Sequence, residues 1–296
     1  MKTTMHIEHI ALKTELIKFL RENYPDEAEA LTPLLRPCIR MKTVSVHSGK
    51  KLTSKFGGSP DVTSGFKWPY DPDGTPLSFL FQLRLEEIAH FPINENIPKS
   101  GMLYFFVLVG KPEHYPEKAG EYRVIYDPEI SVHTSLNGAG VENTAPRFPV
   151  CSVTFHFSYS FPCYQDYEIL QVERETGLDL FDAAGQTLEY LNEITGFERL
   201  PDHKLFGGAD AAQGTVVFHW ARIRLGKHYP FNEADLETIG KQEKFWKLLL
   251  QVDFTDSLLA ANDNSGGLGG LGYFGIEKDA LDKQDFDSCL LIFQDT

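Results

Sequence analysis

Two glutamines inside apolar runs constrain the fold most, because the pattern around each of them occurs twice. Gln82 lies in the run LSFLFQLRL, and Gln251 lies in the run LLLQVDF. Tyr104 follows Gln82 by 22 residues, and Tyr273 follows Gln251 by the same 22 residues, each as the first half of a Tyr-Phe pair. Short apolar runs bounded by turn residues are typical of strands. The equal spacing therefore predicts two related β-rich units in one chain.

A Phe-Gly-Gly sequence precedes each glutamine run, with its glycines at Gly57-Gly58 and at Gly207-Gly208. Glycine enters positive φ without steric cost, so both sequences indicate turns. We expect at least one glycine of each pair to have positive φ or to leave no room for a Cβ atom. An apolar run also follows each Tyr-Phe pair, YRVIYDP in the first unit and CLLIFQD in the second. The four turn glycines then mark equivalent corners of the two units.

Strand periodicity assigns the side chains of the first glutamine run to two faces. One face is predicted to carry Phe79, Phe81, Leu83 and Leu85, with Gln82 on the opposite face. A buried amide needs hydrogen-bond partners, because an unsatisfied one costs about 1–3 kcal/mol. Each amide could satisfy backbone groups near its own turn.

A second interpretation gives the glutamines a function. Gln82 and Gln251, together with Tyr104 and Tyr273, would line a groove between the two units. Both interpretations are open at this point.

The remaining sequence completes an α+β prediction with mostly antiparallel sheets. Residues 1–36 have the apolar spacing of helices, and VTFHFSYSF alternates as a strand does. Further helices are expected near 179–196 and from Asn232 to Phe245, where Asn232 is a candidate N-cap. No linker-like tract separates the halves. We therefore expect one domain over residues 1–296, with repeats at about 53–130 and 200–296.

Charge and cysteine usage restrict the partners and the compartment. The formal net charge is −14 and the sequence pI is about 5.1. A nucleic-acid or anionic-membrane partner needs clustered Lys and Arg, so neither is expected. The first twenty residues do not resemble a signal peptide, and no run is long and apolar enough to span a membrane. The four cysteines are widely separated, which favours reduced thiols and a cytoplasmic protein.

No motif predicts a cofactor, a metal or a catalytic centre. GLGGLG at 267–272 matches a dinucleotide fingerprint, but a strand rather than a helix is expected after it, and the role of Gly266–Gly272 is left open. His6 and His9 lack a third ligand at a telling spacing. His133, His156 and His203 could meet acids in space, because a triad is defined by geometry. An enzyme is the less favoured class.

Several of these motifs also resemble a known family. The chain from about Thr53 to the C-terminus is similar to the YwqG-like family of uncharacterised bacterial proteins, through the Phe-Gly-Gly-x-Pro turn, Trp68-Pro69 and LFQL. The resemblance implies one soluble β-rich α+β unit with an internal repeat and no established reaction. Some relatives are encoded beside contact-dependent toxins, which suggests an immunity or partner-binding role. The stretch NSGGLGGLGYF departs from the family pattern, since no acid stands directly before its Tyr-Phe strand.

The expected function is therefore binding without turnover. We expect a non-catalytic, immunity-like module whose partner is a basic, toxin-like protein. The alternative is a hydrolase or small-molecule-binding enzyme with a cleft between the two repeats. A deep polar pocket with convergent His and acid groups would favour the enzyme, and a broad acidic surface would favour the binding module.

Overall fold

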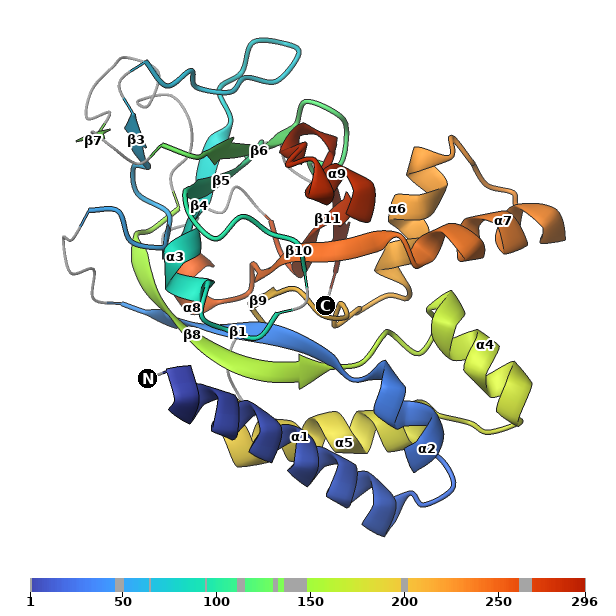
Figure 1. The fold of residues 1–296 in the computed structure, drawn as a ribbon. Coiled ribbons are helices and arrows are strands. Elements are labelled where there is room, and N and C mark those ends of the chain that lie inside the picture. The colour runs from blue at the N-terminus through green and yellow to red at the C-terminus, as the bar shows by residue number, and fades with distance from the viewer. Residues whose placement is uncertain are drawn as a thin grey trace.

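A single ten-stranded sheet organises the chain in the computed structural model (Figure 1). The structure describes all residues except 1, 46–50, 64, 94, 111–114, 130–132, 136–147, 198–201, 261–267 and 296. The strands of the sheet are β1 (Arg36–Val44), β2 (Lys55–Phe56), β4 (Ser78–Arg84), β5 (Met102–Val107), β6 (Tyr122–Asp127), β8 (Cys151–Ser160), β9 (Lys204–Leu205), β10 (Trp246–Asp253), β11 (Leu271–Glu277) and β12 (Leu290–Gln294). A two-stranded sheet joins β3 (Asp61–Thr63) to β7 (His133–Ser135).

Helices surround this sheet, so the architecture is α+β. They are α1 (Lys2–Asn23), α2 (Ala28–Leu31), α3 (Leu85–Ile88), α4 (Tyr167–Thr176), α5 (Phe181–Thr195), α6 (Val216–Arg224), α7 (Glu233–Glu243), α8 (Ser257–Ala260) and α9 (Lys278–Asp282). None of the helices in the described part of the chain combines the length and the apolar character that crossing a membrane requires.

The strand order runs β12-β11-β10-β9-β1-β8-β2-β4-β5-β6, with antiparallel neighbours throughout. The long strands β1 and β8 pair at the centre, and each half then continues with a short strand and three longer ones. Across β4 and β5, Gln82 lies opposite Tyr104, and across β10 and β11, Gln251 lies opposite Tyr273. The predicted glutamine and Tyr-Phe runs are therefore adjacent strands in both halves.

A register irregularity corrects one prediction about the first glutamine run. The β4–β5 ladder shifts between Phe79 and Phe81, and the β10–β11 ladder shifts at the same distance before its own glutamine. A β-bulge re-aims the side chains that precede it. Phe79 consequently packs with Phe106 on the outer face, while Phe81 and Leu83 join the inner core. The predicted common face for Phe79, Phe81, Leu83 and Leu85 was thus wrong for Phe79.

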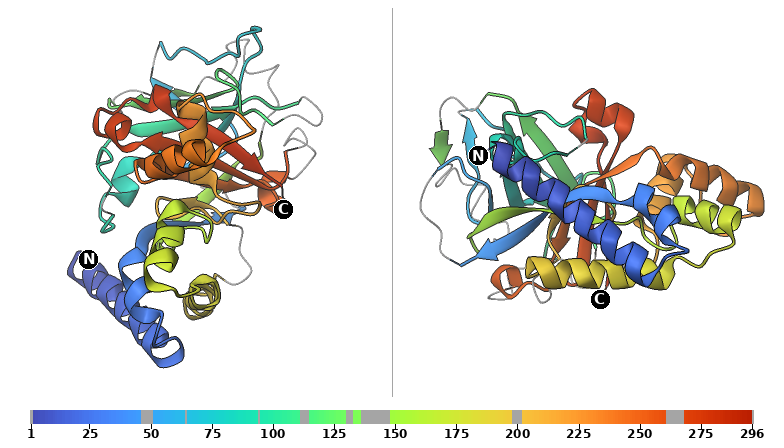
Figure 2. Two further views of the ribbon diagram at one scale, coloured as in Figure 1. Left: turned by 90° about the vertical axis from the view of Figure 1, so that its right-hand side faces the viewer. Right: turned by 60° about the horizontal axis from the view of Figure 1, so that its bottom comes forward.

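The sheet curls so far that it is nearly barrel-shaped, and its two halves share the core that it encloses. Phe105 of β5 and Phe274 of β11 meet inside, with ring centroids 5.1 Å apart. Helices α1, α2, α4 and α5 form a layer below β1 and β8 (Figures 1 and 2). Helices α6 and α7 lie together beside the half that contains β10 (Figure 1). Separate apolar clusters thus seal the outer faces.

Local signals explain where some helices begin and end. Helix α7 begins after Asn232, whose side chain accepts from the Asp235 N–H in a capping box. Helix α5 ends at Gly196, which has a φ of 73°. Both helices lie where the sequence predicted them. Helices α4 and α6 were not predicted. The first turn of α6 contains Val216 and Val217, and its buried Trp220 packs in the outer cluster beside β10, so tertiary contacts select the helix there.

Candidate functional site

The predicted residues of the first unit form a buried polar cluster, here called the first amide cluster: Lys55, Asp61, Gln82 and Tyr104. The Gln82 side chain accepts from the Asp61 N–H at 2.8 Å and donates to the Asp61 carboxylate at 2.9 Å and to the Thr53 carbonyl at 2.7 Å. The Lys55 ammonium lies 3.3 Å from the same carboxylate. The Tyr104 hydroxyl donates to the Asp61 carbonyl at 2.5 Å.

The second unit contains the same set of contacts, here called the second amide cluster: Lys204, Asp210, Gln251 and Tyr273. The Gln251 side chain accepts from the Asp210 N–H at 2.9 Å and donates to the Asp210 carboxylate at 3.1 Å and to the Asp202 carbonyl at 2.8 Å. Lys204 lies 2.6 Å from that carboxylate, and the Tyr273 hydroxyl donates to the Asp210 carbonyl at 2.9 Å. Each glutamine therefore ties the chain after its turn to the sheet.

The turns of the two clusters have the same backbone geometry, but the Phe-Gly-Gly sequence is shifted by one position between them. Asp61 lies six positions after Lys55, and Asp210 lies six positions after Lys204. Counted from the lysine, the same two positions have positive φ in both turns: Gly57 (59°) and Gly58 (67°) in the first, Phe206 (62°) and Gly207 (77°) in the second. A Cβ on Gly57 would lie 2.2 Å from the Pro149 carbonyl oxygen, and one on Gly208 would lie 1.9 Å from the Phe161 carbonyl oxygen.

Burial decides what these clusters can do chemically. Gln82 and Gln251 are 0% exposed, and their amides are occupied by their own turns. Burial raises the pKa of the Tyr104 and Tyr273 hydroxyls. Burial is the largest single influence on the pKa of Asp210 and acts to raise it, but the charges of Lys204 and Arg40 and the hydrogen bonds from Lys204 and Gln251 together hold this pKa below its usual value. The clusters hold the fold together, and a groove between the two units stays a prediction.

One of the predicted histidines does meet an acid. The His203 Nε2 atom lies 3.0 Å from the Asp256 carboxylate, and its Nδ1 atom accepts from the Asp253 N–H at 3.1 Å. This assignment makes His203 a neutral Nε2–H tautomer. The ring is 0% exposed, so it positions the chain after β10. The His156 Nε2 atom lies 3.0 Å from the Thr154 hydroxyl, and the side chain of His133 lies outside the described residues.

The glycine-rich segment leads into a strand. Gly266 and Gly267 lie outside the described residues, while Gly270 has a φ of 70° and β11 begins at Leu271. A pyrophosphate site of the dinucleotide type needs a helix N-terminus at that point. Among the described residues, no group of three or more His, Cys, Asp and Glu side chains could hold a metal ion.

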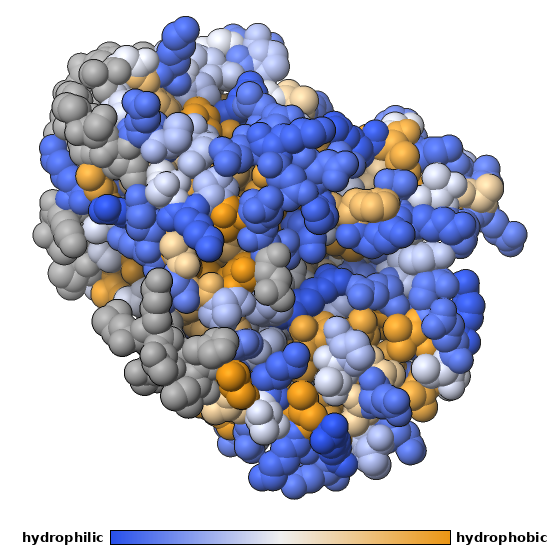
Figure 3. Space-filling model, viewed as in Figure 1, coloured by the Kyte–Doolittle hydropathy of each residue, from blue (hydrophilic) through white to orange (hydrophobic). Residues whose placement is uncertain are grey.

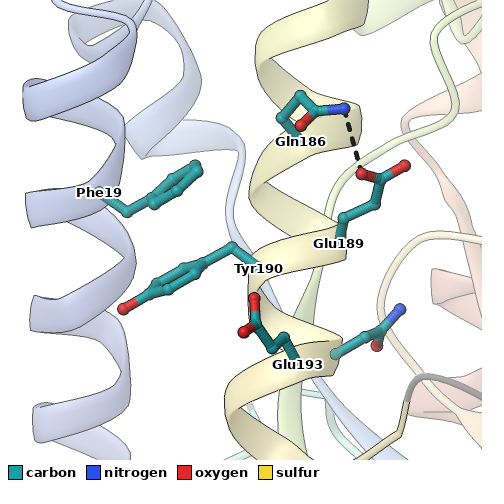
Figure 4. A pocket seen from close by; sticks show the side chains of 6 residues that line it. Phe19, Gln186, Glu189, Tyr190 and Glu193 are labelled. Carbon is teal, nitrogen blue, oxygen red and sulfur yellow. Dashed lines mark hydrogen bonds between the residues drawn. The ribbon is translucent and has the colours of Figure 1, made fainter.

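An open groove between α1 and α5 is the better candidate for a functional site (Figure 4). Its volume is about 420 Å³, and Phe19 of α1 and Tyr190 of α5 lie in it as a parallel pair, with ring centroids 4.3 Å apart and planes 9° apart. The Tyr190 hydroxyl donates to the Glu15 carboxylate at 2.9 Å. Glu189 and Glu193 of α5 line the same groove, here called the acidic aromatic groove.

Acidic groups dominate the electrostatics of this groove. Helix α5 contains Asp182, Glu189 and Glu193 and no Lys or Arg. The hydrogen bond to Glu15 is the main cause that raises the pKa of Tyr190, and the charges of Glu193 and Glu22 raise it further. Lys18 and Arg21 of α1 are basic neighbours of Phe19 in the sequence, and the Lys18 ammonium lies 3.9 Å from the Glu15 carboxylate. A cation entering the groove would therefore meet Glu189 and Glu193 on the α5 wall, while Glu15 of α1 is bound to the Tyr190 hydroxyl.

The groove can hold a cationic side chain. A Lys or Arg placed over an aromatic face is attracted by the ring, and carboxylates bind the same cation through charge-assisted hydrogen bonds. Figure 3 shows apolar residues interspersed with polar ones over the lower helices. Sequence reasoning missed this site because Phe19 and Tyr190 are 171 residues apart, although their helical spacing from Glu15 and Glu193 was visible.

The class of protein is thus an α+β protein with an antiparallel sheet, two buried amide clusters and an exposed acidic groove. The chain belongs to the family described as a domain of unknown function, DUF1963, whose model matches residues 54–294. No curated protein matches the chain. The family match begins after β1, so α5 lies inside it and α1, which forms the other wall of the groove, lies outside it.

Proposed function

We propose that this protein binds a basic polypeptide in the acidic aromatic groove and acts without turnover. The observation that carries the proposal is the stacked Phe19–Tyr190 pair, which is flanked by Glu15, Glu189 and Glu193. Charge complementarity of this kind raises the association rate and selects the partner. A basic, toxin-like protein fits the groove, and an immunity-like role follows from such a partner.

Two features of the groove support binding over catalysis. Its lining residues are aromatic, amide and carboxylate side chains, and neither a histidine nor a cysteine is among them. Nucleophilic catalysis needs a nucleophile within hydrogen-bond reach of a base. His203, which contacts the Asp256 carboxylate, is fully buried in another part of the fold.

We further propose that the chain is a YwqG-like member of its family, that residues 1–296 form one domain, and that the two sheet halves arose by internal duplication. The two amide clusters support the duplication, since the same four side-chain types make the same contacts in each. The shared inner core supports one domain. The binding site then lies in the helical layer, which falls outside this duplicated part.

A defined peptide tests the binding proposal. A fluorescent ten-residue peptide of Arg and Gly should bind the protein at low salt, and its affinity should fall as the salt concentration rises. The double variant Glu189→Gln/Glu193→Gln should weaken binding by roughly fivefold to tenfold, because exposed charge pairs contribute up to about 1 kcal/mol each.

A matched control separates the groove from net charge. The variant Glu129→Gln/Glu175→Gln removes the same charge from exposed positions that do not line the groove. It should leave the affinity within about twofold of the parent. Equal weakening by both double variants, or no peptide binding at low salt, would show that the groove is not the recognition site. A screen with general hydrolase substrates should give no turnover.

A further inference from the structure

A second cavity, of about 550 Å³, lies between α4 and α7 on a different side of the helical layer. The two helices meet closely, since a Cβ on Gly240 of α7 would lie 2.2 Å from the ring of Tyr167 on α4. The lining includes the four cations Arg36, Lys241, Lys244 and Lys247. Four cations around one cavity are unusual in a chain whose net charge is −14.

The carboxylates of this cavity are already occupied within the protein. Asp166 accepts from the Thr215 hydroxyl at 2.6 Å and from the Cys163 N–H at 2.9 Å. Glu243 accepts from the Tyr167 N–H at 2.7 Å. Glu168 pairs with Arg36. Glu243 therefore caps α4, and these partners leave the acids little acceptor capacity for a ligand. Two further lining cations also have ion-pair partners, since Lys241 lies 3.0 Å from Glu237 and Lys247 lies 3.3 Å from Glu95.

The polar groups of the cavity that remain available to a ligand are hydrogen-bond donors. Gln171 lines the cavity, and its side-chain nitrogen is buried and has no hydrogen-bond acceptor in the described part of the chain. Lys244 is positioned over the Phe245 ring at 5.0 Å, and no ion pair of Lys244 occurs among the described residues. Burial raises the pKa of Glu243 to about 8, so its carboxyl group keeps a proton at neutral pH and can donate it.

We propose that the α4–α7 cavity binds a small anion rich in hydrogen-bond acceptors, such as a polycarboxylate or a phosphate ester. Gln171 and the Glu243 carboxyl would donate to it, and Lys244, which has no ion pair among the described residues, would meet its charge. Lys247 would add its charge beside its ion pair with Glu95. The volume is in the range of small-molecule sites. This site is separate from the acidic aromatic groove, and its ligand has the opposite charge.

The protonated Glu243 makes a pH prediction of its own. The charged and titratable groups that face it are Asp166, Arg36, Glu168, Lys241, Lys244 and Lys247. The native pKa lies above the ordinary value of 4.5, so the native state holds more protons than the unfolded state between about pH 4.5 and 8. This contribution to stability is present below pH 4.5 and is lost as the pH rises through 8. Glu243→Gln should therefore raise the melting temperature more at pH 8.5 than at pH 5, measured by thermal unfolding against the parent. A variant whose effect is the same at both pH values would contradict a protonated Glu243.

Titration of the full-length protein with citrate, and separately with inorganic phosphate, tests the anion site by calorimetry. Binding of citrate alone would identify the ligand class as a polycarboxylate, and binding of phosphate alone would identify it as a phosphate ester. Gln171→Leu and Lys244→Ala should each weaken binding by about tenfold, the effect of losing a hydrogen bond to a charged group. The exposed Lys283→Ala is the matched control and should leave the affinity unchanged. The proposal is overturned if neither anion binds at about 10 mM, which is above the dissociation constant of even a weak, millimolar complex. It is also overturned if the control variant weakens binding as much as the cavity variants do.

Discussion

Replacing Gln82 or Gln251 by leucine should lower the free energy of unfolding by about 4 kcal/mol in each case. Each amide makes three hydrogen bonds in a fully buried site. Leucine cannot replace them, so a backbone N–H and a backbone carbonyl would each stay buried without a partner. Urea unfolding followed by circular dichroism measures the loss.

The two glutamine variants should also resemble each other, because the two clusters make the same contacts. Gln186→Leu provides the control, since Gln186 is exposed on α5 and its replacement should change stability by no more than about 0.5 kcal/mol. A large loss for one glutamine and a small loss for the other would contradict the equivalence of the two halves.

Replacing the buried lysines, in contrast, should cost the two clusters different amounts of stability. Lys55→Met removes the partner of Asp61, and the two side chains are only 7% and 3% exposed. Breaking a buried ion pair from one side typically costs about 3–5 kcal/mol, and we expect that loss here. Lys204→Met should cost less, about 2 kcal/mol, because the Asp210 side chain is 29% exposed and water can solvate its charge.

The same unfolding experiment measures this difference, with the exposed Lys283→Met as the control for loss of one surface charge. An equal loss for the two lysine variants would mean that solvent does not reach Asp210. A larger loss for Lys204→Met would contradict the assignment of Lys55 to the more deeply buried cluster.

The sequence predicted the parts of the fold that follow from local spacing. The glutamine and Tyr-Phe runs form neighbouring strands, and Asn232 caps α7, because short-range patterns specify both. The bulge before each glutamine could not be predicted, since it depends on pairing with the next strand. Aligning the two Phe-Gly-Gly sequences places the turns one position out of register, because the φ values show that Phe206 is the equivalent of Gly57.

The candidate site was less accessible to sequence reasoning than the fold. The net charge of −14 supported the expectation of an acidic binding surface, but it did not point to α5. Its aromatic partner, Phe19, belongs to a helix near the other end of the sequence. Only the packing of α1 against α5 brings Phe19 to Tyr190. The predicted glutamines and tyrosines, in contrast, lie in the two buried clusters.

Mapping the contact site of a basic peptide tests the central claim most directly. An Arg-rich peptide with a photoreactive group would be cross-linked to the full-length protein at low salt, and the labelled residues would be identified by mass spectrometry. The account predicts labels on α1 and α5 around Phe19 and Tyr190, and their loss in the Glu189→Gln/Glu193→Gln variant. Labels concentrated at the α4–α7 cavity, or spread evenly over the surface and unchanged in that variant, would contradict it.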